Sequence, residues 1–527
     1  MTQESMKRIC MKRLESSAHC WGVNQSKTRG SISINQRAAR SPICGPIFSG
    51  LGRRAVVLFL VTVGLCLAGC SELRANESGV PRVSLGGQLP ICSVVPFIAL
   101  LLSIAVFPLA AGHWWEHNRN KALVVGMLGV PLALYMILAF GAAGVHELAH
   151  NLKEYVSFMA LLGALFVISG GIYVQGSLSG TPLVNTGLLA FGGVIASFVG
   201  TTGASVLLIR PLLRANASRT RKAHVVVFFI FIVSNCGGLL TPLGDPPLFL
   251  GFLNGVPFDW TLHLWKPWAL VNGMLLVIFN VWDQVMLDKE EKEREGSQLE
   301  RLMIHEPLRV YGLPNLLFLA GVVAVVYAAG KGLGSQDGAW PGGLQEGLLI
   351  LMGTASYCTT ARRIHLNNRF SFAPINEIAL LFAGIFVTMT PALLILNANA
   401  GRLGVDRPWE FFWAAGTLSS FLDNAPTYLT FAATACGLHD ISTAEPRYLA
   451  KFLALPATAG AQHVLAAISC GSVFMGANTY IGNGPNFMVK AIAEENGVQM
   501  PGFFGYMAYA GCVLIPIFVI VTFVFFR

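Results

Sequence analysis

Two stretches of this chain cannot form ordinary membrane helices, although apolar segments flank both. The first reads SNCGGLLTPLGDPP (residues 234–247), and the second reads GANTYIGNGPN (residues 476–486). Glycine and proline interrupt a helix, and the polar residues between them expose backbone groups that lipid cannot satisfy. Paired interruptions in corresponding parts of a membrane chain are the best sequence indicator of a secondary transporter's substrate site.

The composition indicates a polytopic membrane protein. Hydrophobic residues make up 54% of the 527 residues and charged residues only 12%, far from the balance of soluble globular proteins. Apolar windows long enough to span a bilayer fall at 93–112, 121–143, 154–174, 223–239, 266–287, 310–330, 345–359, 374–398, 448–470 and 504–526. We expect a multi-pass protein of a cell membrane of the bacterial inner-membrane type.

The net charge of +9 is concentrated at the N-terminus. Residues 1–54 hold ten Lys and Arg against Glu4 and Glu15, so the remainder is nearly neutral and no nucleic-acid groove is predicted. We expect 1–54 to be a disordered basic tail. Residues 55–70, ending in LAGC, are either a cleaved lipoprotein-type signal or a first transmembrane segment.

A charged segment at 288–309 divides the membrane region. It reads DKEEKEREGSQLERLMIHEPLR, a mixed-sign pattern typical of a solvated helix. We interpret it as a linker between a first transmembrane repeat at 91–287 and a second at 310–527. The basic loop at 214–222 and this linker are expected on the cytoplasmic side, because Lys and Arg are enriched there.

The same order of features occurs in both halves. A hairpin with a polar tip, at 200–205 or 419–427, precedes each interrupted helix. We therefore predict an all-α, inverted-repeat secondary transporter with two re-entrant hairpins and two broken helices. Non-helical backbone at membrane depth must line a cavity or be buried in protein, so the four polar segments are expected to converge.

Three quoted motifs carry a family resemblance. GTTGASVLLIRPLL, SNCGGLLTPLGDPPLFLGFLNGVPFDW and GANTYIGNGPNFMVKAIAEENGV resemble the putative citrate-transport family of the Ion Transporter superfamily, over about residues 90–527. That superfamily includes NhaD-type sodium/proton antiporters and divalent-anion/sodium symporters. The resemblance implies the inverted repeat, but it does not decide between a cation and a carboxylate as substrate.

Asp245 and Asp423 are the leading candidates for ion binding. A carboxylate at a membrane helix break is costly, and such groups usually mark an ion path or a proton relay. The alternative is that each merely caps a half-helix. DNAP at 423–426 is similar to the hairpin tip of NhaD-type antiporters, which implies ion binding by Asp423, Asn424 and Thr427. Divalent-anion symporters instead carry Ser-Asn-Thr at both tips, a pattern that this chain lacks.

The remaining candidates supply neutral oxygens. Sodium prefers several hard oxygen donors, and Thr and Asn beside unwound backbone provide them. Singly, each is better explained as a helix–helix hydrogen bond, but clustered at four breaks they indicate a site. The predicted ion-binding residues besides the aspartates are Thr201, Thr202, Asn235, Thr241, Asn424, Thr427, Asn478, Thr479, Asn483 and Asn486.

Two further motifs offer alternatives. Glu377 begins an apolar segment and is either a third proton-coupling carboxylate, with Asp245 and Asp423, or an interfacial charge favoured by the helix dipole.

His146-Glu147-Leu148-Ala149-His150 matches the HExxH pattern of zinc proteases. An intramembrane zinc metalloprotease, with Asp245 as a conceivable third ligand, is therefore a remote alternative. HELAH is expected in the polar junction at 144–154, outside an apolar helix, and we predict neither catalytic nor metal-binding residues.

The sequence thus favours a secondary active ion transporter that is not an enzyme. No GxxxxGK[ST] nucleotide-binding loop occurs, so transport is expected to depend on an ion gradient. Sodium/proton antiport is the first interpretation, and sodium- or proton-coupled citrate or dicarboxylate transport is the alternative. We expect no cofactor beyond sodium or protons as coupling ions. The expected partners are the lipid bilayer and a small cation or carboxylate, with a homodimer as one option for assembly and no nucleic acid.

Overall fold

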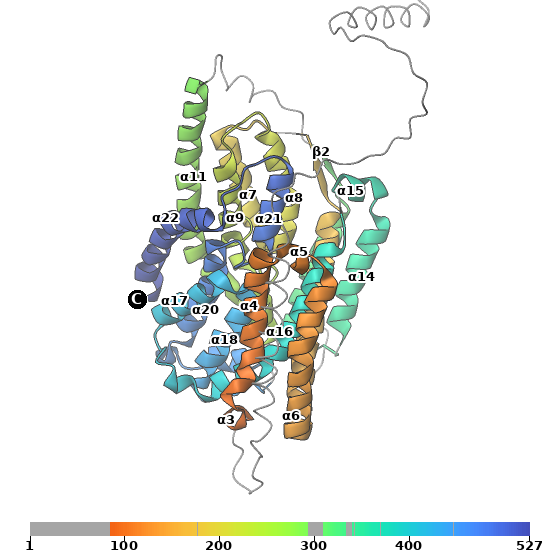
Figure 1. Cartoon of the computed structure of the whole chain (residues 1–527), viewed down its shortest axis with the longest axis vertical. Helices are drawn as coiled ribbons and strands as arrows, with labels where there is room; N and C mark the ends of the chain where they lie inside the picture. Colours follow the sequence, from red (N-terminus) through yellow and green to blue (C-terminus); the bar gives the residue numbers. More distant parts are fainter. Residues whose placement is uncertain are drawn as a thin grey trace, which may run out of the picture. The chain divides into compact units, whose positions relative to one another are not determined.

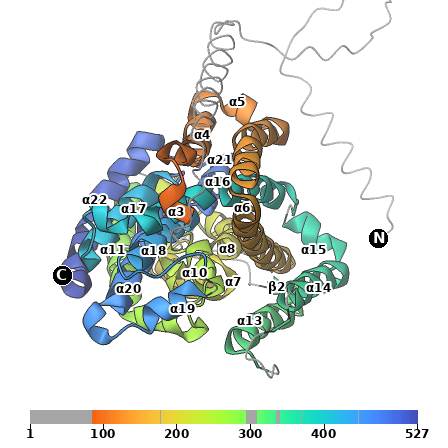
Figure 2. The same cartoon turned by 90° about the horizontal axis from the view of Figure 1, so that it is seen from below.

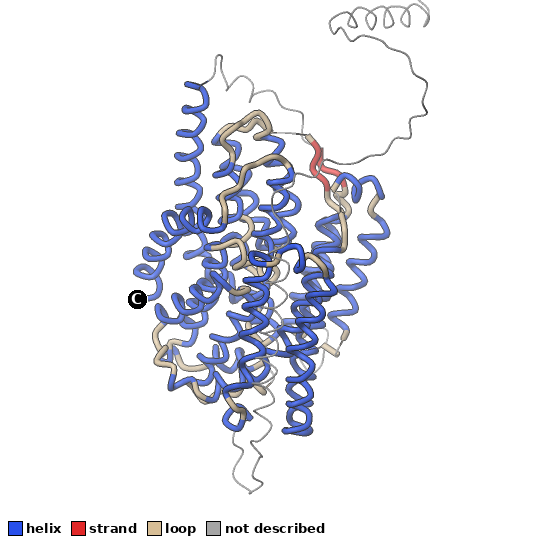
Figure 3. The backbone as a smooth tube through the Cα atoms, viewed as in Figure 1, coloured by secondary structure: helices blue, strands red, loops and turns tan. Residues whose placement is uncertain are grey.

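The computed structural model describes residues 85–176, 178–293, 309–333, 340–341, 343–368, 370–445 and 447–527. The predicted tail at 1–54 and the signal-like or membrane segment at 55–70 lie outside these ranges. Helices dominate the described residues, and one short pair of strands accompanies them (Figure 3).

The elements up to residue 293 are mostly long apolar helices. In chain order they are α3 (Leu85–Gln88), η2 (Ile91–Val94), α4 (Val95–Ala110), α5 (Gly112–Trp115), α6 (Asn118–Gly170), β1 (Tyr173–Gln175), α7 (Pro182–Val199), α8 (Thr201–Ala215), α9 (Ala223–Ile232), η3 (Cys236–Leu240), α10 (Pro246–Leu253), η4 (Phe258–Leu264) and α11 (Trp265–Glu293).

The elements from residue 309 onward repeat this alternation of long and short helices. They are β2 (Arg309–Tyr311), α13 (Asn315–Lys331), α14 (Leu344–Thr359), α15 (Arg362–Asn367), α16 (Ala373–Ala398), η5 (Ala400–Arg402), α17 (Pro408–Phe421), α18 (Asn424–Gly437), α19 (Tyr448–Leu453), η6 (Ala457–Ala459), α20 (Ala461–Met475), η7 (Gly476–Asn478), α21 (Gly484–Glu495), α22 (Phe503–Val521) and η8 (Thr522–Phe526).

Seven helical segments among the described residues are long and apolar enough to cross a bilayer. Several of them expose large apolar side chains, as at Val130 and Leu134 of α6 and at Val277 and Val281 of α11, each more than half exposed. Continuous apolar faces of this size are unfavourable in water. The prediction of an all-α, multi-pass membrane protein is therefore confirmed.

Helix α6 is a hairpin of two legs. Gly141 interrupts it with a non-helical backbone (φ 52°, ψ −127°). A Cβ at Gly144 would lie only 2.1 Å from the carbonyl oxygen of Met136, whereas residues eight apart in a straight helix are separated by about 12 Å. The chain therefore reverses at Gly141, as two separate windows at 121–143 and 154–174 predicted. The expected polar junction at 144–154 is wrong, because these residues continue the second leg.

The apolar window at 448–470 is not one helix. α19 ends at Leu453, and α20 begins only at Ala461. Pro456 starts the intervening turn, and Gly460 lies in the left-handed region with φ 67°. Both residues oppose a continuous helix, so hydrophobicity alone placed this span wrongly.

The charged segment at 288–309 begins as a continuation of α11, which runs to Glu293; residues 294–308 lie outside the described ranges. β2 then pairs antiparallel with β1, with Tyr173 opposite Tyr311. Beside this pair, Asn315 Nδ2 donates to the carbonyl of Gly171 at 2.8 Å. The residues that follow α6 are therefore joined to the residues that follow the charged segment.

The interrupted helix beginning with α9 lies in the interior. Every residue from Val225 to Val233 is at most 1% exposed, as expected for a helix that is apolar on all sides. α17, α18 and α20 pack together near it, whereas α13 and α14 pack against α6 on another side (Figures 1 and 2). Polar groups at the end of α9 are therefore out of reach of lipid and must find partners within the protein.

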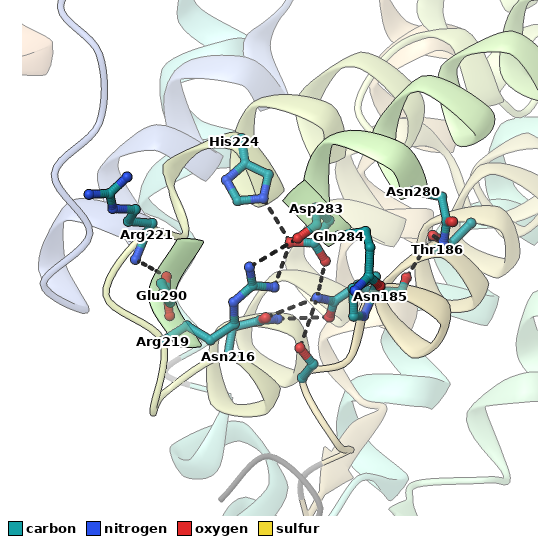
Figure 4. Close-up of polar contacts among 12 residues, drawn as sticks. Asn185, Thr186, Asn216, Arg219, Arg221, His224, Asn280, Asp283, Gln284 and Glu290 are labelled. Carbon is teal, nitrogen blue, oxygen red and sulfur yellow. Dashed lines mark hydrogen bonds and ion pairs between the residues drawn. The ribbon is translucent and has the colours of Figure 1, made fainter. Parts of the chain in front are cut away.

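A buried ionic network ties α7, α8, α9 and α11 together (Figure 4). Asp283 of α11 accepts from Arg219 Nη1 at 2.5 Å and from Asn185 Nδ2 at 2.9 Å, and it lies 2.7 Å from His224 Nε2. Asn216 Nδ2 donates to Asn185 Oδ1 at 2.8 Å. The side chains of Arg219 and Asp283 are both fully buried, so neither charge has water to replace its partner.

Asp283→Ala is expected to lower the free energy of unfolding by about 3–5 kcal/mol, because it leaves the buried Arg219 charge unpaired. The effect is measured as the melting temperature in detergent, with the fraction of monodisperse protein as the signal for unfolding. Asp288→Ala is the matched control: Asp288 lies on the same helix but is exposed, and it accepts from Gln284 at 2.9 Å. Equal melting temperatures for the two variants would contradict the prediction.

Candidate functional site

Four helices begin at the predicted polar segments. The residue before each first helical residue is Gly200 for α8, Asp245 for α10, Asp423 for α18 and Asn483 for α21. Gly200 has φ 81°, a conformation that glycine adopts without strain. Helix N-termini carry unpaired N–H groups and a partial positive charge. The local sequence thus creates four polar helix starts within an apolar protein.

The carboxylate of Asp245 connects its own helix start with the other three. Its Oδ1 accepts from Thr201 Oγ1 at 2.9 Å and from Asn483 Nδ2 at 3.3 Å. Its Oδ2 accepts from Asn424 Nδ2 at 2.5 Å. All four residues are at most 3% exposed. The two predicted hairpin tips and the two interrupted helices therefore meet at one buried carboxylate, and Asp423 adjoins Asn424 in the chain.

Asparagines join the two interrupted helices directly. Asn235 Nδ2 donates to Asn486 Oδ1 at 2.7 Å, and Asn483 Nδ2 lies 3.1 Å from Asn235 Oδ1. Asn486 in turn donates to the carbonyls of Gly476 and Thr479 at 2.8 and 2.9 Å. These bonds satisfy backbone oxygens that the broken helix leaves without helical partners.

Thr241 and Thr479 hold equivalent places in the two breaks. The hydroxyl of Thr241 donates to the carbonyl of Ser197, and the hydroxyl of Thr479 donates to the carbonyl of Ser420 at 2.5 Å. Each threonine oxygen also accepts from the backbone N–H two residues later, at 3.2 Å in both cases. The same hydrogen-bond pattern therefore occurs twice, once between each hairpin and its break.

The sequence reasoning missed the serines in this pattern. Ser197 Oγ donates to the carbonyl of Gly237 at 2.6 Å, and Ser420 Oγ contacts that of Met475 at 3.1 Å. Each serine lies four residues before the first residue of its hairpin's second helix. Aligning SFVGT (197–201) with SFLDN (420–424) on their shared Ser and Phe is the signal that would have found them.

Two amide oxygens on the predicted polar segments accept no hydrogen bond from any described residue. Within the described residues, Asn424 Oδ1 and Asn478 Oδ1 are buried and accept no hydrogen bond, although their amide nitrogens donate to Asp245 and to Ser420. A buried acceptor without a donor is costly. A cavity of ≈ 30 Å³ adjoins Asp245 and is also lined by Thr201 and Thr202, which is room enough for one water molecule.

A profile of the putative citrate transport family matches residues 86–526, almost all of the described chain. The chain belongs to this family. No curated protein matches it. Together with the spanning helices, family membership indicates a multi-pass membrane transporter rather than an enzyme, and the resemblance drawn from the sequence motifs is confirmed.

Not every predicted residue of this citrate-transport family member lies at the Asp245 cluster. Glu377 Oε1 forms a 2.6 Å ion pair with Lys121 Nζ at the start of α6, so its carboxylate is held by a cation instead of by a helix break. Thr427 Oγ1 donates to the carbonyl of Asp423 at 3.0 Å, a bond within the first turn of α18. The structure thus brings Asp245, Thr201, Asn424 and Asn483 together and leaves Glu377 elsewhere.

The HExxH motif lies on the second leg of α6. The His146 side chain is 71% exposed and that of His150 only 30%. Across the part of the chain that the structure describes, no group of three or more His, Cys, Asp and Glu could hold a metal ion. The conceivable third ligand, Asp245, is instead hydrogen-bonded to Thr201, Asn424 and Asn483.

Purified protein is therefore expected to hold less than stoichiometric zinc, and His146→Ala with His150→Ala is expected to leave its metal content unchanged. Elemental analysis of the parent and the double variant, prepared side by side without chelator, measures this. Stoichiometric zinc that disappears in the double variant would instead support the metalloprotease alternative.

Proposed function

We propose that this transporter exchanges sodium for protons across the cell membrane. The observation that carries the proposal is the buried Asp245 carboxylate, on which groups from both hairpin tips and the second break converge. A carboxylate in this position can hold either a proton or a cation, and exchange requires a site that holds one or the other.

Unpaired oxygens on the polar segments favour sodium as the cation. Asn424 Oδ1 and Asn478 Oδ1 lack hydrogen-bond partners among the described residues, and both are hard donors of the kind that sodium prefers. Asp423, directly before Asn424, adds a second negative charge at the same tip. A site with two carboxylates attracts a cation and repels citrate until sodium or a proton neutralises it.

We further propose that residues 91–287 and 310–527 are inverted repeats joined by the charged segment. The support is the duplicated hydrogen-bond pattern of Thr241 with Ser197 and Thr479 with Ser420. Inverted repeats in transporters place the substrate at the repeat interface. Thr201 and Asn424, one from each hairpin, would then be equivalent residues that bind opposite oxygens of Asp245.

Coupled transport of citrate or a related dicarboxylate is the second candidate. The family description favours it. Four helix N-termini also surround the cluster, and helix N-termini stabilise anionic groups. Under this alternative, sodium bound at Asp245 and Asp423 would neutralise the carboxylates before the anion binds.

Reconstitution of the purified full-length protein separates the two candidates. Liposomes with an internal pH dye would be challenged with sodium, lithium, potassium or choline, and uptake of labelled citrate would be measured in the same preparation. Antiport predicts proton movement on addition of sodium alone and no citrate uptake. Sodium-dependent citrate uptake without proton movement on sodium addition alone would reject antiport in favour of symport.

A further inference from the structure

A second polar cavity lies apart from the Asp245 cluster. Its volume is ≈ 20 Å³, and its lining includes Glu147, His150 and Glu154 of α6, Thr390 of α16 and Tyr448 of α19. That is room for one water molecule. The first three residues extend the HExxH motif that the transport site leaves unused.

The two glutamates share one buried face of α6. Glu147 and Glu154 are each 8% exposed, and residues seven apart lie on the same side of a helix. Glu154 Oε1 lies 3.4 Å from His150 Nε2, and Glu147 Oε1 lies 3.8 Å from His146 Nδ1. Each carboxylate therefore has a histidine as a basic neighbour.

The other helices around the cavity contribute no charged group. α16 contributes Thr390 and two leucines, α18 Leu429 and α19 Tyr448, while Asn254 follows α10. No Lys or Arg lines the cavity among the described residues. Those closest along the chain, Lys153 and Arg447, line a neighbouring pocket together with Glu346. The glutamates thus lack the fixed cation that holds Asp283.

An independent observation indicates a ligand in this cavity. Thr443 is 8% exposed and lines it, yet its hydroxyl has no hydrogen-bond partner among the described residues. Asn151, on the same face of α6, is already bonded to Thr390 Oγ1 at 2.9 Å. A water molecule would satisfy the Thr443 hydroxyl and would also link it to the carboxylates.

The cavity adjoins the helices that carry the candidate site. α10 begins after Asp245, and Asn254 at its other end lines the cavity. α10 has eight residues, so this end lies about 12 Å from Asp245. The following element, η4, leads into the start of α11, whereas the charged segment follows the end of α11. Because α11 is long enough to span a membrane, the cavity lies toward the face opposite the charged segment.

We propose that Glu147 and Glu154 form a proton-loading station between that face and Asp245. A hydronium ion transfers its proton to the Glu154 carboxylate, which leaves a water molecule and a neutral carboxylic acid; the acid later returns the proton to water in the cavity. His150 positions Glu154, and no metal takes part. The coupling role rests on the proposed antiport, whereas proton binding by the two glutamates does not.

Carbodiimide labelling tests proton binding without any transport assay. A hydrophobic carbodiimide adds to a protonated carboxyl and rearranges to a stable N-acylurea, with no atom lost. Full-length protein in liposomes would be labelled at a series of pH values and its peptides analysed by mass spectrometry. We expect adducts on Glu147 or Glu154 that increase as the pH falls, and none on Asp283, a buried carboxylate already paired with Arg219.

The transport assay supplies the second measurement. In the double variant Glu147→Gln with Glu154→Gln, we expect the transport rate to lose the pH dependence that the parent protein shows. The variant is expected to elute as folded protein in size-exclusion chromatography. Glu494→Gln is the matched control, because Glu494 pairs with Lys490 at 2.7 Å in an exposed contact.

The possible outcomes separate the two proposals. Folded protein without adducts on either glutamate would overturn the proton-loading station, as would equal labelling of Asp283 or an unchanged pH profile in the double variant. If the adducts on Glu147 or Glu154 depend on pH but the protein moves no protons on sodium addition, the proton-loading station is supported and antiport is overturned.

Discussion

Asp245→Asn is expected to abolish sodium-driven proton movement in liposomes, with at least a ~100-fold fall in initial rate. The carboxylate accepts from Thr201, Asn424 and Asn483. The asparagine amide has no negative charge. Its NH2 group would also face one of the neighbouring hydrogen-bond donors, with which it cannot form a hydrogen bond. Losing charge-assisted hydrogen bonds worth about 3 kcal/mol corresponds to a factor of ~100.

The matched control for this change is Asp259→Asn. Asp259 also forms a polar contact, an ion pair with Lys331 Nζ at 3.0 Å, but its side chain is 53% exposed. This control is expected to transport at the parental rate. Parental transport by folded Asp245→Asn protein would show that the carboxylate is structural and would remove the central support for antiport.

Asp423→Asn is expected to eliminate sodium-dependent proton movement in everted vesicles without loss of folded protein. The residue precedes the first turn of α18, and Asn and Asp are nearly equivalent at a helix N-cap. Folding should therefore survive, whereas one of the two negative charges at the site is lost. The initial rate after sodium addition, normalised to folded protein, measures the effect.

Asp406→Asn serves as the control for the second change, because Asp406 is an exposed aspartate shortly before α17. If Asp423→Asn retained proton movement, the titrating role would belong to Asp245 alone. Citrate uptake that requires sodium, in a protein that releases no protons on addition of sodium alone, would favour the symport alternative. The predicted location of the site would not change.

Much of the candidate site was predictable because its causes are local. Gly and Pro in 234–247 and 476–486 interrupt a helix wherever the segment lies, and the structure contains both interruptions. Apolar flanks then require the freed polar groups to be buried. The same local logic predicted the two legs of α6, although the turn depends on Gly141 and not on the polar residues that follow it.

Two predictions drawn from local pattern were wrong. HELAH is polar enough for a junction, but Glu147 lies within the second leg of α6 and its side chain lines a cavity. The window at 448–470 is apolar throughout, yet a turn at Pro456 and Gly460 divides it.

The sequence by itself determined that this is a helical membrane protein of one transporter family, with two helix breaks and two carboxylates at helix starts. The family follows from the resemblance of three motifs, and the other properties follow from composition and from residue types that interrupt a helix. Only the tertiary structure decided that Thr201 and Asn424, 44 and 179 residues from Asp245, bind opposite oxygens of its carboxylate. A hydrogen bond between distant segments depends on how whole helices pack, and no local preference encodes it.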